Sequence, residues 1–294
     1  MVVVAGIGMA VFASLLFNAG VVLQALEARR EPPELGLRLA LLWALLRRWR
    51  WLLGLALGAI GVVPQIIALE LAPFVVVQPA LTVGLLLVLA IGARTFDEHP
   101  GPREWLAVGS IIAGVALVAV GVPPHTEQHR GGVFVIVVVL GLSGCSIVPF
   151  LTRNHGGGSG VVTMVASGVG FAATNIATKL VSDDLGLGHY WNAGGWATIA
   201  LLDGIAATVT GMTAFQRARA TVVVPVTTAL QAFLPIVLEP LFLREQWSQA
   251  TLAGLPLAAG VLIAAAGTIN LARAPGIGQM VATANRPGDA AASS

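Results

Sequence analysis

The sequence predicts an all-α, polytopic membrane protein with about nine transmembrane helices in an inverted-topology repeat. Three observations lead to this prediction: the scarcity of charge, the length of the apolar stretches, and an internal repeat. Of the 294 residues, 56% are hydrophobic and only 10% are charged, whereas soluble domains carry about 25% charged residues. The chain therefore has too little polar surface for a water-soluble fold. Its net charge of +2 also argues against a nucleic-acid-binding protein.

Nine apolar stretches are long enough to cross the hydrocarbon core of a bilayer, which takes about 20 residues per helix. None shows the alternation of apolar and polar residues that marks a membrane β-strand, so each is expected to be a helix. The predicted spans are residues 2–24, 51–69, 71–92, 104–122, 132–151, 160–180, 195–215, 219–243 and 248–271.

The basic segment 27–50 connects the first two spans and contains the run L-R-L-A-L-L-W-A-L-L-R-R-W-R. Its arginines leave fewer than ten uncharged residues in a row, so we expect an interfacial helix, or an extension of the second span, rather than a further span. The tail, 272–294, is small and polar and is predicted to be disordered. The chain thus divides into a first half (1–122), a linking span (132–151) and a second half (160–271).

The basic residues lie mostly on one side of the predicted membrane. Loops on the side of segment 27–50 hold 13 of the 16 Lys and Arg residues, and the other side holds Arg130, Lys179 and Arg244. Basic loops stay in the cytoplasm, so the N-terminus is predicted outside and the C-terminus inside. The abundance of Ala, Gly, Val and Arg is typical of a bacterial source, which suggests a bacterial plasma membrane.

A shift of 146 residues aligns the two halves without a gap. The shift places Pro79 on Pro225 and brings three pairs of glycines into the same register. The glycine pairs are Gly58 with Gly204, Gly114 with Gly260, and Gly121 with Gly267. Corresponding spans are five apart, an odd number, so the two halves cross the membrane in opposite directions. Inverted halves of this kind are typical of secondary transporters, whose site lies near the midplane. The alternative is an ancestral duplication without a surviving transport role.

Two segments carry a family resemblance. The stretch A-L-E-L-A-P-F-V-V-V-Q-P-A-L-T-V-G at 68–84, then an acidic loop and I-I-A-G-V-A-L-V-A-V-G-V-P, resembles the drug/metabolite transporter superfamily. The second half repeats the pattern with R-A-T-V-V-V-P-V-T-T-A-L and A-A-G-V-L-I-A-A-A-G. Within the superfamily the layout is most similar to the NIPA-type magnesium transporters of the EamA-like branch. The resemblance implies nine spans, a long basic loop after the first, an outside N-terminus, and Mg²⁺ or a related divalent cation as cargo.

Two carboxylates fall inside predicted spans, where an ionised side chain costs about 2.5–3.5 kcal/mol even on lenient scales. Asp203 lies about eight residues into the seventh span, roughly 12 Å from its outer end. We interpret Asp203 as a transport-site carboxylate and metal ligand, with a structural partner for a neighbouring helix as the alternative. Glu239 lies nearer the outer end of the eighth span. It is read either as a pathway residue or as an interfacial one.

Uncharged polar residues and prolines within the spans supply the rest of a candidate pathway. Such amides either line a path or make interhelical hydrogen bonds, and mid-span prolines either act as hinges or make packing kinks. The amides are Asn18, Gln65, Gln78, Asn175 and Gln231, and the hinge prolines are Pro79 and Pro225.

The predicted function is transport of Mg²⁺ or another divalent cation down the membrane potential by alternating access. Mg²⁺ needs only one or two carboxylates because it keeps several waters. Mg²⁺ would be the substrate, and no cofactor is expected. One alternative is a proton-coupled carrier of a small organic metabolite, drug or lipid precursor, with Asp203 as the proton site. The other is a non-transporting membrane scaffold.

An enzyme is not expected. The run G-L-S-G at 141–144 resembles the nucleophile motif of rhomboid intramembrane proteases. Such a serine needs a histidine within hydrogen-bond reach, and all five histidines lie in predicted loops. The expected partners are therefore the lipid bilayer and a small ion or molecule, without nucleic acid. The number of subunits stays open, with a homodimer as one form.

Overall fold

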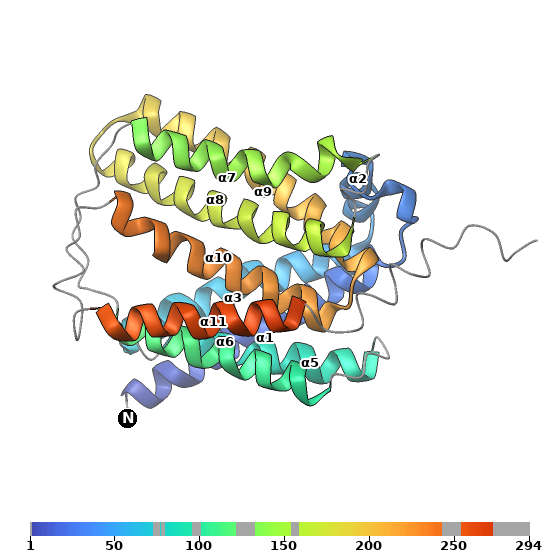
Figure 1. Ribbon diagram of the computed structural model, residues 1–294, viewed down its shortest axis with the longest axis horizontal. Coiled ribbons are helices and arrows are strands. Elements are labelled where there is room, and N and C mark those ends of the chain that lie inside the picture. Colours follow the sequence, from blue (N-terminus) through green and yellow to red (C-terminus); the bar gives the residue numbers. More distant parts are fainter. Residues whose placement is uncertain are drawn as a thin grey trace, which may run out of the picture.

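The computed structural model describes residues 2–72, 77, 80–95, 101–121, 133–153, 159–242 and 254–272. Within these ranges all regular structure is helical, and the long helices run side by side in one bundle (Figure 1). The helices are α1 (Val2–Ala28), η1 (Pro33–Leu35), α2 (Leu39–Leu46), α3 (Trp49–Leu71), α5 (Gly84–Thr95), α6 (Pro102–Gly121), α7 (Val133–Leu151), α8 (Gly160–Gly186), α9 (Tyr190–Arg217), α10 (Ala220–Phe242) and α11 (Leu255–Ala272).

Among the described residues, five helices are long and apolar enough to cross a membrane: Val2–Ala28, Trp49–Ala68, Phe134–Leu151, Gly160–Gly186 and Tyr190–Arg217. Three shorter apolar helices accompany them: Ala80–Ile91, Ala220–Pro235 and Leu255–Leu271. Large apolar side chains face outward from the bundle. Leu106 is 70% exposed and Leu262 is 69% exposed, and lipid rather than water suits such a surface. These findings agree with the predicted all-helical polytopic membrane protein.

Each predicted span contains a helix, but several boundaries differ from the prediction. α11 is described from Leu255, directly after Gly254, which has a left-handed φ of 78°, and residues 248–253 of the predicted span lie outside the described residues. Pro256 then falls in the first turn of the helix, where a missing N–H is tolerated. α9 begins at Tyr190, five residues before the predicted start, because the turn at Gly188 (φ 76°) ends there. α5 begins at Gly84, but residues 80–82 before it are also helical, with a turn at Val83, and residues 73–76 and 78–79 of the predicted span lie outside the described residues.

The basic segment after α1 folds back onto the bundle through the short helix α2. Leu41 and Leu45 are fully buried, while Trp43 on the opposite face is 66% exposed. The backbone N–H of Leu37 donates a hydrogen bond to Thr213 Oγ1 on α9 at 2.9 Å. One face of α2 therefore belongs to the core, and segment 27–50 is fixed to the end of α9.

The most extensive helix contacts join α1 to α3, α8 to α9, and α6 to α11. Glycines allow the close approach in the first of these pairs. A Cβ atom placed on Gly20 would lie 2.5 Å from the carbonyl oxygen of Gly54, and one on Gly54 would lie 2.6 Å from that of Gly20. Small residues at such crossings are the usual way for membrane helices to associate, because dispersion contacts grow as the backbones approach.

α3 and α9 end in the same way, 146 residues apart. Ala72 and Ala218 cap the two helices in extended conformations, with φ of −143° and −142°. Their N–H groups donate to the carbonyls of Ala68 and Ala214 at 2.9 and 2.8 Å. A glycine faces each cap from the neighbouring helix: Gly6 of α1 faces Ala72, and in the second half a glycine at the start of α8 faces Ala218. The α1–α3 contact therefore has a counterpart in the α8–α9 contact.

Candidate functional site

Asp203 is buried between α9 and α7. Its side chain is 3% exposed, and Ser143 Oγ on α7 donates a hydrogen bond to Asp203 Oδ2 at 2.7 Å. Ser143 Oγ also lies 2.9 Å from the carbonyl oxygen of Val139, one turn earlier on α7. Asp203 thus faces α7, where its hydrogen-bond partner is the neutral hydroxyl of Ser143.

The two contacts of Ser143 depend on the protonation of Asp203. A serine hydroxyl has one hydrogen and two acceptor lone pairs. When Asp203 carries a proton, its own O–H donates to Ser143, and Ser143 donates to Val139. When Asp203 is ionised, the Ser143 hydrogen turns to the carboxylate and the contact with Val139 is lost. The Ser143–Asp203 pair can therefore hold a proton within the bundle and change its hydrogen bonds when the proton leaves.

Asn18 lies where α1 contacts the start of α5. It is 9% exposed, and its Nδ2 donates to the carbonyl oxygen of Ser14 at 2.8 Å. Ser14 Oγ in turn donates to the carbonyl oxygen of Leu81 and accepts from the N–H of Gly84 at 2.9 Å. Ser14 thus makes the hydrogen bonds between α1 and the residues around the start of α5. Asn18 bonds within its own helix, beside that contact.

Asn175 and Gln231 are the two predicted pathway residues that the structure brings together. Asn175 Nδ2 on α8 donates to the backbone carbonyl oxygen of Gln231 on α10 at 3.4 Å. Asn175 is exposed and Gln231 is half-buried. Gly168 of α8 faces Thr227 and Leu230 of α10. These two residues come 146 positions after Leu81 and Gly84, the residues that Ser14 of α1 contacts, so the α8–α10 contact corresponds to the α1–α5 contact. That register places Asn175 about one helical turn beyond the counterpart of Asn18.

The remaining predicted residues are spread over other elements. Gln65 is half-buried on α3, next to Pro64, and Pro225 is buried within α10, which continues through it. Glu239 is part of α10, but its side chain lies outside the described residues. Gln78 and Pro79 also lie outside them. The described part of the chain therefore does not gather the predicted residues into one site.

α6 and α11 cross at Gly114 and Gly260. A Cβ atom on either glycine would lie 2.6 Å from the carbonyl oxygen of the other. On one side of this crossing Gly121 faces Leu257, and on the other Gly267 faces Ile111. The two helices are therefore antiparallel. Gly267 comes 146 positions after Gly121, and Leu257 comes 146 positions after Ile111. The two contacts are therefore equivalent under the sequence repeat.

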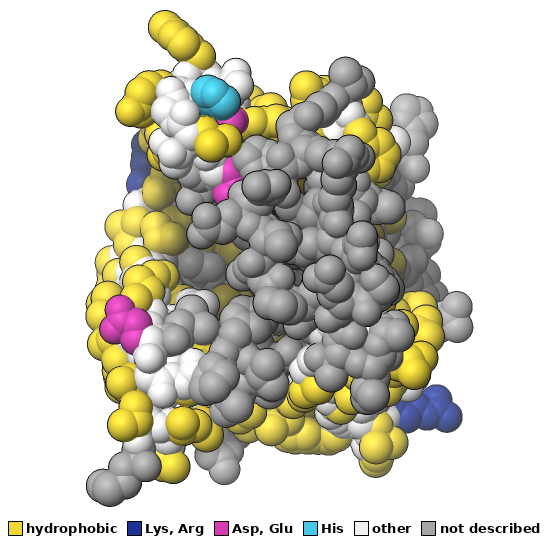
Figure 2. Space-filling view, turned by 90° about the vertical axis from the view of Figure 1, so that its left-hand side faces the viewer, with side chains coloured by type: hydrophobic (Ala, Val, Ile, Leu, Met, Phe, Trp, Pro, Cys, Tyr) yellow, Lys and Arg dark blue, Asp and Glu magenta, His cyan; other side chains and the backbone are white. Residues whose placement is uncertain are grey.

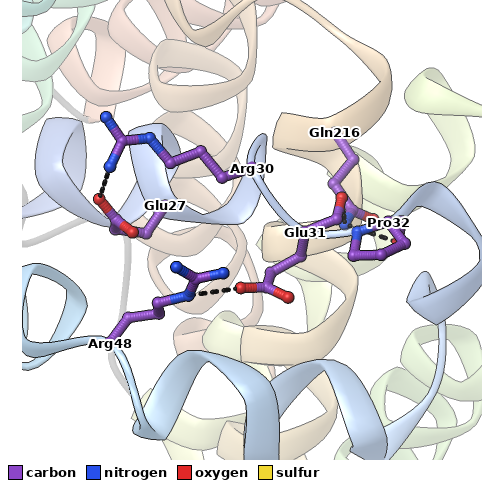
Figure 3. A network of polar contacts seen from close by, with 6 residues as sticks. All are labelled: Glu27, Arg30, Glu31, Pro32, Arg48 and Gln216. Atoms are coloured by element: carbon purple, nitrogen blue, oxygen red, sulfur yellow. Dashed lines mark hydrogen bonds and ion pairs between the residues drawn. The ribbon is translucent and has the colours of Figure 1, made fainter.

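Charged and polar contacts close one end of the bundle. Figure 3 shows Arg48 Nε donating to Glu31 Oε1 at 2.8 Å, and Gln216 Nε2 of α9 donating to the carbonyl oxygen of Glu31 at 3.2 Å. Glu27 and Arg30 form a second ion pair beside them, at 2.7 Å (Figure 3). The segment after α1 is thereby tied to the end of α9.

Two arginines add contacts between the halves at the same end. Arg29 donates to the carbonyl oxygens of Phe215 and Ala218, each at 3.0 Å. Those oxygens belong to the last turn of α9 and to its C-cap residue, where a cation is favourable. Arg219, at the start of α10, pairs with Glu104 of α6 at 2.8 Å, with side chains 15% and 7% exposed. This second pair is almost fully withdrawn from solvent and joins the first half to the second.

Sequence reasoning missed Ser143 as the partner of Asp203. Its sequence signal is the G-L-S-G run at 141–144, which resembles a protease motif and does not indicate a contact with a carboxylate. Among the described residues no group of three or more His, Cys, Asp or Glu side chains is placed to hold a metal ion. Any ion bound at Asp203 would rely on that carboxylate, on hydroxyl and carbonyl oxygens, and on its own waters.

Comparison of the chain with family models, with curated proteins and with solved structures finds no match.

Proposed function

We propose that the protein is a membrane transporter whose two inverted halves exchange conformations by alternating access. The observation that carries the proposal is the crossing of Gly114 and Gly260. These glycines occupy equivalent positions of the two sequence repeats, and each faces the other's carbonyl oxygen at the same separation. Equivalent residues of two units meet in this reciprocal way where a two-fold axis passes between them. Because α6 and α11 are antiparallel, the axis runs across the helices, as inverted repeats require.

The ends of the bundle support a conformational role. Arg219–Glu104 and the contacts of Arg29 with α9 link the two halves at the end that carries segment 27–50. In an alternating-access protein, contacts of this kind hold one side closed and must break when that side opens. We assign them to the closed state of the cytoplasmic side, where the positive-inside rule places these arginines.

Mg²⁺ or another divalent cation, moved inward by the membrane potential, is the cargo implied by the family resemblance. The potential supplies roughly 4.6 kcal/mol per 100 mV for a divalent ion. The Ser143–Asp203 pair favours a second candidate. The Ser143 hydroxyl can accept a hydrogen bond from a protonated Asp203 carboxyl group. A carboxyl group that takes up and releases protons is what a carrier needs to exchange protons for a small organic molecule. In both cases Asp203 is the residue that binds and releases the cation.

Flux into proteoliposomes tests the proposal. We would measure Mg²⁺ uptake under an imposed potential, and separately proton movement under an imposed pH gradient with candidate organic amphiphiles. The wild type would be compared with Asp203→Asn and with Asp183→Asn, a carboxylate at the end of α8. Uptake lost only in Asp203→Asn supports the cation carrier with Asp203 on its path. Coupled proton movement lost only in that variant supports the proton-coupled carrier.

Two outcomes would contradict the proposal. Uptake that is the same in Asp203→Asn and the wild type would remove Asp203 from the path. The absence of any flux in a folded wild type, over several divalent cations and several amphiphiles, would leave the scaffold alternative.

A further inference from the structure

A groove of about 500 Å³ opens between α7, α8 and α9, at the end of the bundle where α7 and α9 begin. This volume lies within the range of about 300–1,000 Å³ that is usual for ligand sites. The groove is separate from the crossing of α6 and α11, and a ligand can bind in it whether or not the protein transports a solute.

The groove is polar at its mouth and apolar at its floor. Asp184, near the end of α8, and Asn192, in the first turn of α9, lie at the mouth. Val135 of α7 and Leu180 of α8, which are 3% and 8% exposed, line the floor, and Ile199 of α9 continues the apolar lining away from the mouth. A ligand that matches this gradient has a polar head and an apolar tail.

The position of the groove relative to the bilayer follows from its aromatic residues. Trp191 and Tyr190, in the first turn of α9, are 95% and 72% exposed, and exposed Trp and Tyr side chains at helix ends mark the membrane–water interface. Ile199 lies eight residues further along α9, about 12 Å deeper. One leaflet of the hydrocarbon core is about 15 Å thick. The mouth therefore lies at headgroup level and the floor among acyl chains. Figure 2 shows this end of the bundle, where hydrophobic side chains (yellow) lie along much of the edge.

Asp184 places an acidic side chain at the mouth. This side chain is 9% exposed, and its Oδ1 lies 3.5 Å from Nδ1 of His189, which is 59% exposed. A buried carboxylate is stabilised by a cation that donates hydrogen bonds to it. Trp191 and Trp196, which also line the groove, offer ring faces that attract an ammonium group.

We propose that this groove binds a phospholipid with a primary-amine headgroup, with the ammonium on Asp184 and one acyl chain along the floor. A lipid is favoured over a soluble amphiphile because the groove runs from headgroup level into the depth of one leaflet.

Two neighbouring glycines provide a matched test. A Cβ on either Gly194 or Gly195 would meet nothing within 4 Å, and of the two only Gly195 lines the groove. Gly195→Leu therefore fills the groove without disturbing the backbone, and Gly194→Leu is its control. Asp184→Asn removes the charge, and Glu70→Gln, at an exposed carboxylate near the end of α3, is its control.

Each variant would be equilibrated with vesicles of phosphatidylethanolamine and phosphatidylglycerol that share the same acyl chains. Native mass spectrometry in mild detergent then counts the lipids that stay bound, and the melting temperature checks the fold. The wild type and both controls should retain phosphatidylethanolamine about tenfold over phosphatidylglycerol, which is the size of one charge-assisted hydrogen bond. Gly195→Leu and Asp184→Asn should lose that preference.

The proposal is overturned if the folded wild type shows no preference, or if Gly195→Leu behaves like Gly194→Leu. A long-chain alkylamine offered in solution distinguishes the other occupant. If the alkylamine binds and phosphatidylethanolamine does not compete with it, the groove takes a soluble amphiphile and the lipid assignment is wrong.

Discussion

Gly114 of α6 and Gly260 of α11 lie against each other so closely that a Cβ on either would come within 2.6 Å of the other's carbonyl oxygen. A separation of this kind leaves no room for any side chain, because the obstructing atoms are backbone. The crossing therefore depends on glycine at both positions, and these are two positions that the internal repeat aligns.

Replacing either glycine should destabilise the protein. Gly114→Ala and Gly260→Ala must push the two backbones apart, which costs about 1–3 kcal/mol by analogy with overpacked cores. Gly109→Ala is the control, since Gly109 is on the same helix and has nothing within 4 Å of an added Cβ. The measurement is the midpoint of thermal unfolding in detergent. Equal midpoints for Gly114→Ala and Gly109→Ala would show that the close crossing is not formed in solution.

Ser143→Ala should affect both stability and the response to pH. The substitution removes the hydrogen bond at 2.7 Å to Asp203, and bonds to a charged group contribute about 1.5–3 kcal/mol. The loss should be larger at a pH where Asp203 is ionised, because only the ionised form needs a donor. Ser110→Ala is the control, since the Ser110 hydroxyl donates to the carbonyl of Leu106 on its own helix. Unfolding midpoints over a range of pH test this, and a loss independent of pH would contradict it.

Much of the fold could be predicted from the sequence, because membrane helices are read from length and apolarity alone. Every predicted span contains a helix. The ends were harder, because local backbone preferences decide them: α11 starts after the left-handed Gly254 and accepts Pro256 in its first turn. Segment 27–50 was rightly expected to contain a short helix, whereas the burial of Leu41 and Leu45 depends on the end of α9.

The candidate site was predicted only in part. The cost of a charge in hydrocarbon was enough to single out Asp203, since that argument needs no partner. Its contact with Ser143 could not be predicted, because it depends on α7 lying against α9. Likewise Gly114 and Gly260 could be aligned in sequence, but their contact follows from an antiparallel crossing that composition does not encode.

Breaking the Arg219–Glu104 pair should open the end of the bundle that it closes. Glu104→Gln leaves the Arg219 guanidinium, 15% exposed, without its anion, and loss of one partner of a buried pair costs about 3–5 kcal/mol. We expect a cysteine at Ala218, which is 2% exposed, to react at least about tenfold faster with a polar maleimide. The background is Cys145→Ser, because Cys145 is exposed.

Arg103→Gln is the control for this variant, since Arg103 is exposed and directly precedes Glu104. It also changes the local charge by one unit, in the opposite direction, and leaves the pair intact. Equal labelling rates in Glu104→Gln and Arg103→Gln would mean that the pair does not hold this end closed.

The measurement that most directly tests alternating access is a pair of distances, one at each end of the bundle. Spin labels at Val4 and Leu187, exposed by 71% and 63%, report on the end where α1 begins. Labels at Trp43 and Leu151, exposed by 66% and 77%, report on the end closed by Arg29 and Arg219. With changes of pH or Mg²⁺ in liposomes, we expect one distance to lengthen as the other shortens. Distances that stay fixed, or that change in the same direction, would contradict the exchange of two inverted halves.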